Sequence, residues 1–274
     1  MNSVCIINTL IPYFNEEGDE IPQGSAAEFG TLLKALLEQG ASVLNLGPVA
    51  HKLRTEESVA QLVRIIRDVR QTYPEAIFQL AARNLAELDI LLKQFHMLMP
   101  DIVSVPLDIF CDEAATGSLR DFASALRSSG SRMALDVHDL SMVFRAVRLQ
   151  HDGLLDGPLR INLHFDQERG VPPDRHAFTF FVQTLRRLAP EATWSGFGGR
   201  KCELELARWS MEMGGHCRAI ETHGQTGASA HAARETPILS KVIQLCKEYG
   251  RRPASPGEAR HVLSLDSATH TSLV

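Results

Sequence analysis

Several features that would mark a particular class of protein are missing from this sequence of 274 residues. Its longest apolar stretches, such as 35–37 and 103–107, are far shorter than the roughly 20 residues of a membrane-spanning helix. No basic run stands out, and 28 basic against 33 acidic side chains give a formal net charge of −5. We therefore expect neither a membrane nor a nucleic-acid partner.

Cysteine pairs and a targeting segment are also missing. The five cysteines are an odd number, widely spaced and without a Cys-x-x-Cys pair, so no structural zinc site is predicted from them. The first residues lack the basic segment and the long apolar core of a signal peptide. Reduced thiols and the missing signal predict a cytoplasmic protein.

Short apolar or β-branched runs alternate with helical segments along the chain. Eight strands are predicted, at residues 4–10, 42–47, 76–82, 102–107, 132–139, 159–166, 192–198 and 216–223. Capping sequences open helices between them, as at Ser25-Ala-Ala-Glu28 and Asn84-Leu-Ala-Glu87, where a small polar side chain precedes an acid by three residues. No glycine-rich phosphate loop follows the first strand, which argues against an open doubly wound sheet. The pattern predicts one (β/α)8 TIM-barrel domain over 1–274, with a short C-terminal helical extension.

Acidic and imidazole side chains fall in pairs at the ends of three predicted strands: Asp136/His138, His164/Asp166 and Glu221/His223. Residues two apart share a face of a strand, and in this architecture active sites form at the C-terminal strand ends. The pairs therefore predict one pocket. Imidazole and carboxylate groups suit a catalytic Zn²⁺, for which the predicted ligands are His164, Glu221 and His223. The alternative is that each histidine is an ordinary hydrogen-bonded structural residue.

Arginine and glycine residues near the strand ends suggest contacts with an anionic substrate. A buried Arg218 needs a partner, and a substrate carboxylate is the predicted one. Its parity differs from that of Glu221, so both face one pocket only if the strand is bulged or tilted. Gly198 and Gly199 precede a helix and are predicted to bind an anion through exposed N–H groups, with a plain tight turn as the alternative. Arg83 is predicted either to contact the substrate or to take part in capping a helix.

Several motifs resemble those of one known family. The segment 250–260 (GRRPASPGEAR) resembles the ending "GR.PAtp.EAR", 214–218 (GGHCR) resembles "GGnvR", and 194–198 (WSGFG) resembles "W…giG". These patterns are those of the β-keto acid cleavage enzymes, the family of 3-keto-5-aminohexanoate cleavage enzyme. The matches extend over nearly the whole chain.

The resemblance implies a (β/α)8 barrel with a catalytic Zn²⁺ that exchanges acyl groups between a β-keto acid and acetyl-CoA. In that family a His-x-His at the end of strand two and a glutamate at the end of strand eight hold the metal. Here Asn45 and Gly47 stand at the histidine positions, and neither replaces an imidazole. Glu221 matches the metal-binding glutamate, and Asp136 matches a family carboxylate on strand five.

We therefore predict a divergent family member that acts on a small carboxylate-bearing keto or amino acid, or an acyl derivative. The reaction is C–C bond cleavage or acyl transfer, with Glu221, Asp136 and Arg218 as catalytic residues and Asn45 as a substrate contact. Zn²⁺ is the expected cofactor, acyl-CoA the cosubstrate, and a homo-oligomer the assembly. The missing His-x-His leaves two alternatives open: a non-catalytic ligand-binding or scaffold protein, and a metal-dependent hydrolase.

Overall fold

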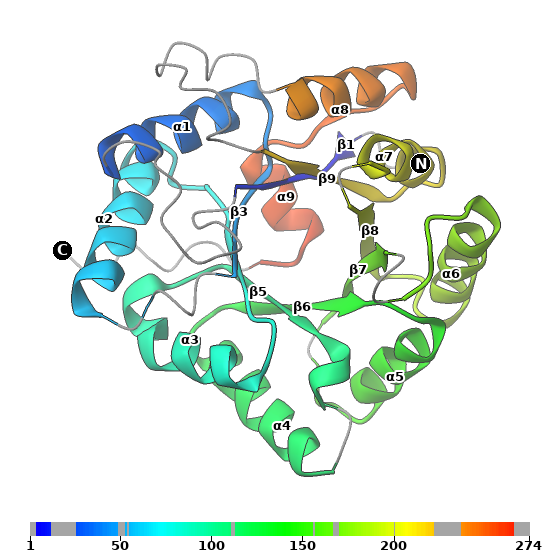
Figure 1. Cartoon of the computed structure of the whole chain (residues 1–274), viewed down its shortest axis with the longest axis horizontal. Helices are drawn as coiled ribbons and strands as arrows, with labels where there is room; N and C mark the ends of the chain where they lie inside the picture. Colours follow the sequence, from blue (N-terminus) through cyan, green and yellow to red (C-terminus); the bar gives the residue numbers. More distant parts are fainter. Residues whose placement is uncertain are drawn as a thin grey trace.

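Eight parallel strands close into a barrel at the centre of the computed structural model, and helices surround them (Figure 1). The structure describes residues 4–11, 26–48, 53, 55–110, 113–155, 157–166, 170–199, 201–221 and 237–265. The strands pair in chain order from β2 to β9, and β9 pairs with β2 to complete the barrel. The predicted (β/α)8 barrel is thereby confirmed. Its extension over all of 1–274 as one domain stays a prediction.

The barrel strands match the predicted alternation closely. They are β2 (Ile7–Leu10), β3 (Val43–Pro48), β4 (Phe78–Ala81), β5 (Ile102–Pro106), β6 (Arg132–Val137), β7 (Arg160–Phe165), β8 (Thr193–Gly198) and β9 (His216–Ile220). The prediction of one strand over 4–10 was wrong, because β1 (Val4–Cys5) leaves the barrel and pairs with β10 (Arg252–Pro253).

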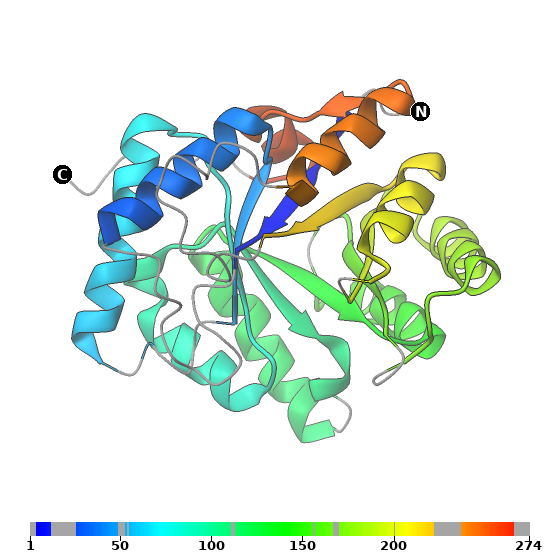
Figure 2. The same ribbon diagram turned by 45° about the horizontal axis from the view of Figure 1, so that its top comes forward.

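Most helices lie outside the barrel in the intervals between strands, as Figure 2 shows from a second direction, whereas the last helix lies across the N-terminal end of the barrel (Figure 1). The helices are α1 (Ala26–Gln39), α2 (Glu56–Thr72), α3 (Leu85–Leu98), the 3₁₀ turn η1 (Leu107–Phe110), α4 (Glu113–Ser128), α5 (Leu140–His151), α6 (Arg175–Leu188), α7 (Glu203–Glu212), α8 (Pro237–Glu248) and α9 (Pro256–Val262). None of the helices in the described ranges is both long enough and apolar enough to span a bilayer.

Side-chain caps account for where several helices begin. Asn84 accepts a hydrogen bond from the backbone of Glu87, as predicted, and Ser255 and Glu258 form a reciprocal capping box at α9. The strand predicted over 132–139 ends at 137, because Asp139 caps α5. The cap predicted at Ser25 lies outside the described residues.

Alternate residues of each strand face opposite sides of the barrel wall. In β7, Phe165 faces outward, with its ring centroid 5.3 Å from that of Phe178 in α6. Its neighbour His164 faces the interior beside Asp136 of β6. The shell between strands and helices is apolar, whereas the interior carries polar groups toward the C-terminal ends of the strands.

The N-terminal end of the barrel is closed by apolar packing and by α9. The interior residues there form a cluster with the C-terminal segment: Ile6, Val43, Ile77, Ile102 and Ala134 with Ala254, Ala259, Leu263 and Leu265. Arg160 secures this plug by donating from Nε to the carbonyl of Leu263 at 2.7 Å. Arg260 of α9 binds Asp101 through two hydrogen bonds of 2.7 and 2.6 Å. Closure of this end leaves the C-terminal mouth for a binding site.

Candidate active site

Inward-facing side chains from four neighbouring strands meet near the C-terminal ends of the barrel: Asp136 of β6, His164 of β7, Phe197 of β8 and Arg218 of β9. Asp136 and Asn162 are register partners on adjacent strands, as are His164 and Phe197. Consecutive strands of a closed parallel barrel therefore bring these groups together, although they are far apart in the sequence.

Asp136 is a mostly buried carboxylate with polar neighbours. Asn162 donates from Nδ2 to Asp136 Oδ1 at 2.7 Å, and Nε2 of His164 lies 3.4 Å from the same oxygen. Ser195 extends the network by donating from Oγ to Asn162 Oδ1 at 3.2 Å. Burial raises the pKa of Asp136, but His164, Asn162 and Arg218 together outweigh it and hold the pKa below its ordinary value. The carboxylate is therefore ionised at neutral pH.

His164 is neutral at neutral pH. Burial lowers its pKa to about 4, against the opposing effect of Asp136, and His138 and Arg218 lower it further. Its ring centroid lies 4.5 Å from that of His138 and 3.6 Å from that of Phe197. A neutral imidazole has one ring nitrogen that accepts a proton, so His164 combines a carboxylate neighbour with a basic nitrogen.

Arg218 places a positive charge in the same space. Its Cζ lies 4.1 Å from the centroid of the Phe197 ring, which is a cation–π contact. Burial lowers the pKa of Arg218 to about 10, although Asp136 and Glu203 raise it, so the group stays charged at neutral pH. Within the described residues its Nε has no hydrogen-bond partner. A buried cation with an open donor is suited to a carboxylate ligand.

The side chain of Glu221 points to α8 and not to the group formed by Asp136, His164 and Arg218. Its Oε1 accepts a hydrogen bond of 3.0 Å from the backbone N–H of Leu239, in the first turn of α8. The register of β9 with β2 runs without a break from Cys217 to Ile220, so no bulge turns Arg218 and Glu221 to one side. The bulge that would let Arg218 and Glu221 face one pocket is therefore not present between Cys217 and Ile220.

The two positions of the family's His-x-His do not suit a zinc ion. Asn45 accepts from Gly47 N at 2.9 Å through Oδ1 and donates from Nδ2 to Asn8 Oδ1 at 3.2 Å. Gly47 has a φ of 70°, and a Cβ built there would lie 3.3 Å from a methyl carbon of Leu10. A histidine in this backbone conformation would be strained. No cluster of three or more His, Cys, Asp or Glu placed to hold a metal occurs in the part of the chain that the structure describes.

The other predicted site residues have definite surroundings. Arg83 forms an ion pair with Glu87 at 2.6 Å and donates its backbone N–H to the same carboxylate, as expected of a helix start. A Cβ at Gly198 would lie 2.4 Å from the carbonyl oxygen of Phe165, so packing requires glycine there. Gly199 has open space around its Cα. Substrate contacts of Arg83, Asn45 and both glycines stay predictions.

The predicted zinc ligands His164, Glu221 and His223 cannot be compared as a set, because His223 lies outside the described residues. Sequence reasoning did not assign roles to Asn162, Ser195 and Phe197. Period-two alternation could have found Asn162, which lies two residues before His164 and so shares its face. Phe197 had no comparable signal, because an apolar residue near a strand end is usually part of a core.

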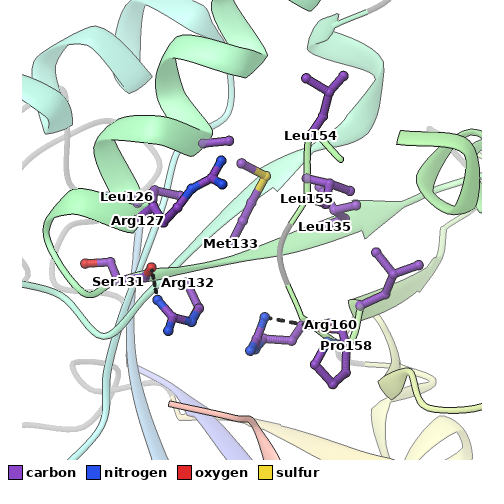
Figure 3. A pocket seen from close by; sticks show the side chains of 12 residues that line it. Leu126, Arg127, Ser131, Arg132, Met133, Leu135, Leu154, Leu155, Pro158 and Arg160 are labelled. Carbon is purple, nitrogen blue, oxygen red and sulfur yellow. Dashed lines mark hydrogen bonds between the residues drawn. The ribbon is translucent and has the colours of Figure 1, made fainter. Parts of the chain in front are cut away.

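The structure has a small cavity inside the barrel and another outside its wall. One, of about 40 Å³, lies inside the barrel, where mostly apolar side chains line it together with Asn8, Gln79, Asn162 and Ser195. The other, of about 30 Å³, lies outside the wall between α4 and the starts of β6 and β7 (Figure 3). Leucines 126, 135, 154 and 155 line it, and its distance from the C-terminal mouth gives it no part in the site.

The fold and the mouth define a (β/α)8 barrel protein with a carboxylate, a neutral imidazole and a buried guanidinium at its C-terminal end. The model of the beta-keto acid cleavage enzyme family matches residues 17–265, and the chain belongs to this family. The predicted resemblance is thereby confirmed. The predicted class of reaction, C–C bond cleavage or acyl transfer on small keto acids, agrees with this family and with the relatives below.

The chain is similar in sequence to two characterised enzymes and in fold to a solved structure. The 3-oxoadipate:acetyl-CoA acetyltransferase of Cupriavidus necator is 32% identical over 247 residues, covering 85% of this chain and 84% of that protein. The 3-keto-5-aminohexanoate cleavage enzyme of Fusobacterium nucleatum is 26% identical over 273 residues, covering 94% and 92%. A solved complex of ObcA with oxaloacetate has a TM-score of 0.64 at 14% identity, covering 90% of this chain and 68% of that one, which shows the fold alone.

Proposed function

We propose that this protein is an enzyme that exchanges acyl groups between a small β-keto acid and an acyl-CoA, breaking and forming a C–C bond. The observation that carries the proposal is the meeting of Asp136, His164 and Arg218 on the inner face of the barrel mouth. The names of the two relatives, an acetyl-CoA acetyltransferase and a keto acid cleavage enzyme, support the same class of substrate.

Arg218 binds the carboxylate of the keto acid. A guanidinium in a site of low dielectric makes charge-assisted hydrogen bonds that are stronger than neutral ones. The Arg218 Cζ lies 4.1 Å from the centroid of the Phe197 ring, and its Nε, without a partner among the described residues, is a donor for the ligand. The bound carboxylate then fixes the position of the carbon between the carboxylate and keto groups.

His164 acts as the general base. Its Nε2 faces Asp136, which leaves the other ring nitrogen as the proton acceptor. With its pKa near 4 it is a weak base in the free protein, but a substrate carboxylate on Arg218 adds negative charge nearby and raises that pKa toward neutrality. His164 then removes the proton from the carbon beside the carboxylate, and the electron pair stays on the substrate as an enolate. Asp136 stabilises the imidazolium that forms.

Turnover is the direct test. The protein is incubated with acetyl-CoA and a panel of small β-keto acids, and new acyl-CoA products are followed by mass spectrometry. Arg218→Ala should lower kcat/KM by about 100-fold or more, because it removes a charge-assisted contact worth about 3 kcal/mol. Arg218→Lys, which keeps the charge, is the matched control. An unchanged kcat/KM in Arg218→Ala would remove this residue from the site.

A second candidate is a ligand-binding protein without catalysis, which the replacement of the family's two histidines by Asn45 and Gly47 favours. It predicts binding of keto acids or acyl-CoA without any acyl exchange across the panel. Cytoplasmic location and homo-oligomeric assembly also stay proposals, and size-exclusion chromatography with light scattering tests the second of them.

A further inference from the structure

We infer that this active site works without the zinc ion of its family, and that the guanidinium of Arg218, held against Phe197, supplies the positive charge at the reacting substrate. The second part rests on the proposed function, whereas the first part does not. The inference follows from what the side chains at the three family ligand positions do in this structure.

A chain of amide side chains includes Asn45 at the first position and accepts the backbone N–H of Gly47 at the second. Asn45 accepts from Gly47 N and donates to Asn8, and Asn8 in turn donates from Nδ2 to Gln79 Oε1 at 2.7 Å. These bonds join β3, β2 and β4 across the barrel interior. A metal ion here would have to break this chain, since an amide oxygen that accepts from a backbone N–H is a poor ligand.

The backbone at Gly47 reinforces that conclusion. The pairing of β3 with β4 shifts register between Asn45 and Pro48, and Gly47 lies within this irregularity in a left-handed conformation. A histidine at position 47 would therefore be strained in this backbone conformation.

Glu221 stands at the third position and holds a helix. Its carboxylate accepts from Leu239 N in the first turn of α8, where the helix dipole favours a negative charge. The side chain is buried, and Glu221 lies one residue past β9 and three residues after Arg218, so the alternation of an extended chain turns it to the opposite side. The residue at the family's glutamate position thus serves to anchor α8.

Arg218 lies where a replacement charge is useful. It is the register partner of Asn8, the middle member of the amide chain, so the guanidinium projects from the strand adjacent to that chain. Phe197 holds it from one side, and the same ring contacts His164 at a centroid distance of 3.6 Å. One aromatic ring therefore positions both the cation and the base. A fixed cation in a mostly buried site stabilises an enolate as it forms, without coordinating it.

Metal content tests the first part. Protein incubated with excess ZnCl₂ and then desalted should retain far less than one zinc per chain by elemental analysis. ZnCl₂ should also leave its midpoint of thermal unfolding unchanged. One tightly held zinc per chain would overturn the inference, and its loss in His164→Ala or His223→Ala would assign it to the ligand set predicted from the sequence.

Binding of acetoacetate, measured by calorimetry with and without EDTA, tests the second part even if no turnover is found. Wild-type affinity should be the same in both conditions, and Arg218→Gln should weaken it by about 10-fold or more. Binding that needs zinc, or that survives Arg218→Gln, would overturn the inference. Failure of the proposed function would show differently, as Arg218-dependent binding with no acyl exchange.

Phe197 is a positioning residue, and its test is kinetic. Phe197→Leu should lower kcat by about 10-fold, as expected from loss of a cation–π contact, while the KM for acyl-CoA and the unfolding midpoint stay near those of the wild type. Phe144→Leu, at an exposed phenylalanine on α5, is the matched control and should change neither. A wild-type kcat in Phe197→Leu would refute the positioning role.

Discussion

Asp101 offers the clearest test of how the closed end of the barrel is held together. This carboxylate is 3% exposed in its side chain and lies just before β5. Its Oδ1 accepts two hydrogen bonds from Arg260 of α9, and its Oδ2 accepts from Arg70 of α2 at 2.8 Å and from Phe78 N at 2.8 Å. One side chain thus joins two helices to the start of β4.

Replacing Asp101 by alanine leaves the buried guanidinium of Arg260 and the partly buried one of Arg70 without their common anion. Burial already lowers the pKa of Arg70, and Asp101 partly offsets that effect. Removing one partner of a buried ion pair typically costs roughly 3–5 kcal/mol, because the remaining charge is left uncompensated. At about 2–4 °C per kcal/mol for a protein of this size, Asp101→Ala should lower the melting temperature by roughly 6–20 °C. Asp101→Asn should fall between, because its amide oxygen can still accept from Phe78 N.

Urea unfolding followed by circular dichroism measures these differences directly. The matched control is Glu212→Ala, which removes an ion pair to Arg175 of 2.9 Å whose side chains are 49% and 36% exposed. Exposed pairs contribute at most about 1 kcal/mol, so this variant should stay close to the wild type. If Asp101→Ala also unfolds within 1 kcal/mol of the wild type, the buried network does not hold the closed end as argued.

Three further changes test local features of the fold. Burial lowers the pKa of His216 to about 3, below about 6.5 in an unfolded chain, so the unfolded state binds more protons between these values. Stability should therefore fall as pH drops below about 6.5, by up to about 1.4 kcal/mol per pH unit, and His216→Gln should show a smaller loss between pH 7 and pH 5 in urea melts. Gly215→Ala places a Cβ 2.4 Å from ring carbons of Trp194 and should cost about 1–3 kcal/mol; a neutral result would mean that the ring moves away freely. Asn84→Ala removes the cap on Glu87 N and should cost about 1 kcal/mol, whereas Asn84→Asp should retain the cap.

The sequence alone was enough for the architecture. Strand and helix periodicities depend on local backbone geometry, and caps such as Asn84 and Ser255 act within one turn of helix. The family motifs at 250–260 and 214–218 carried the resemblance that the family model confirms. Two predicted boundaries were wrong. Residues 4–5 pair with the C-terminal segment, which is a tertiary contact, whereas Asp139 caps a helix in place of ending a strand, which is a local effect.

Individual site residues were predicted, but the predicted sets differ from the observed grouping. Asp136 and Arg218 were predicted as one catalytic set together with Glu221, and His164 was predicted as a zinc ligand with Glu221 and His223. Arg218 and Glu221 lie an odd number of residues apart, so a regular strand would turn their side chains to opposite faces. Only the register of β9 against β2 decided which of them faces the interior, because a bulge in that stretch would have reversed the answer.

Tertiary structure also decided the electrostatics of the site. Neither the neutral state of His164 nor the contact of Arg218 with Phe197 follows from residue types, because both depend on burial and on neighbours from other strands. The sequence determined which groups are present and on which strands they lie, since those are local properties. The closing of eight strands into a barrel determined which of them meet, because packing across the interior joins residues that the chain itself keeps far apart.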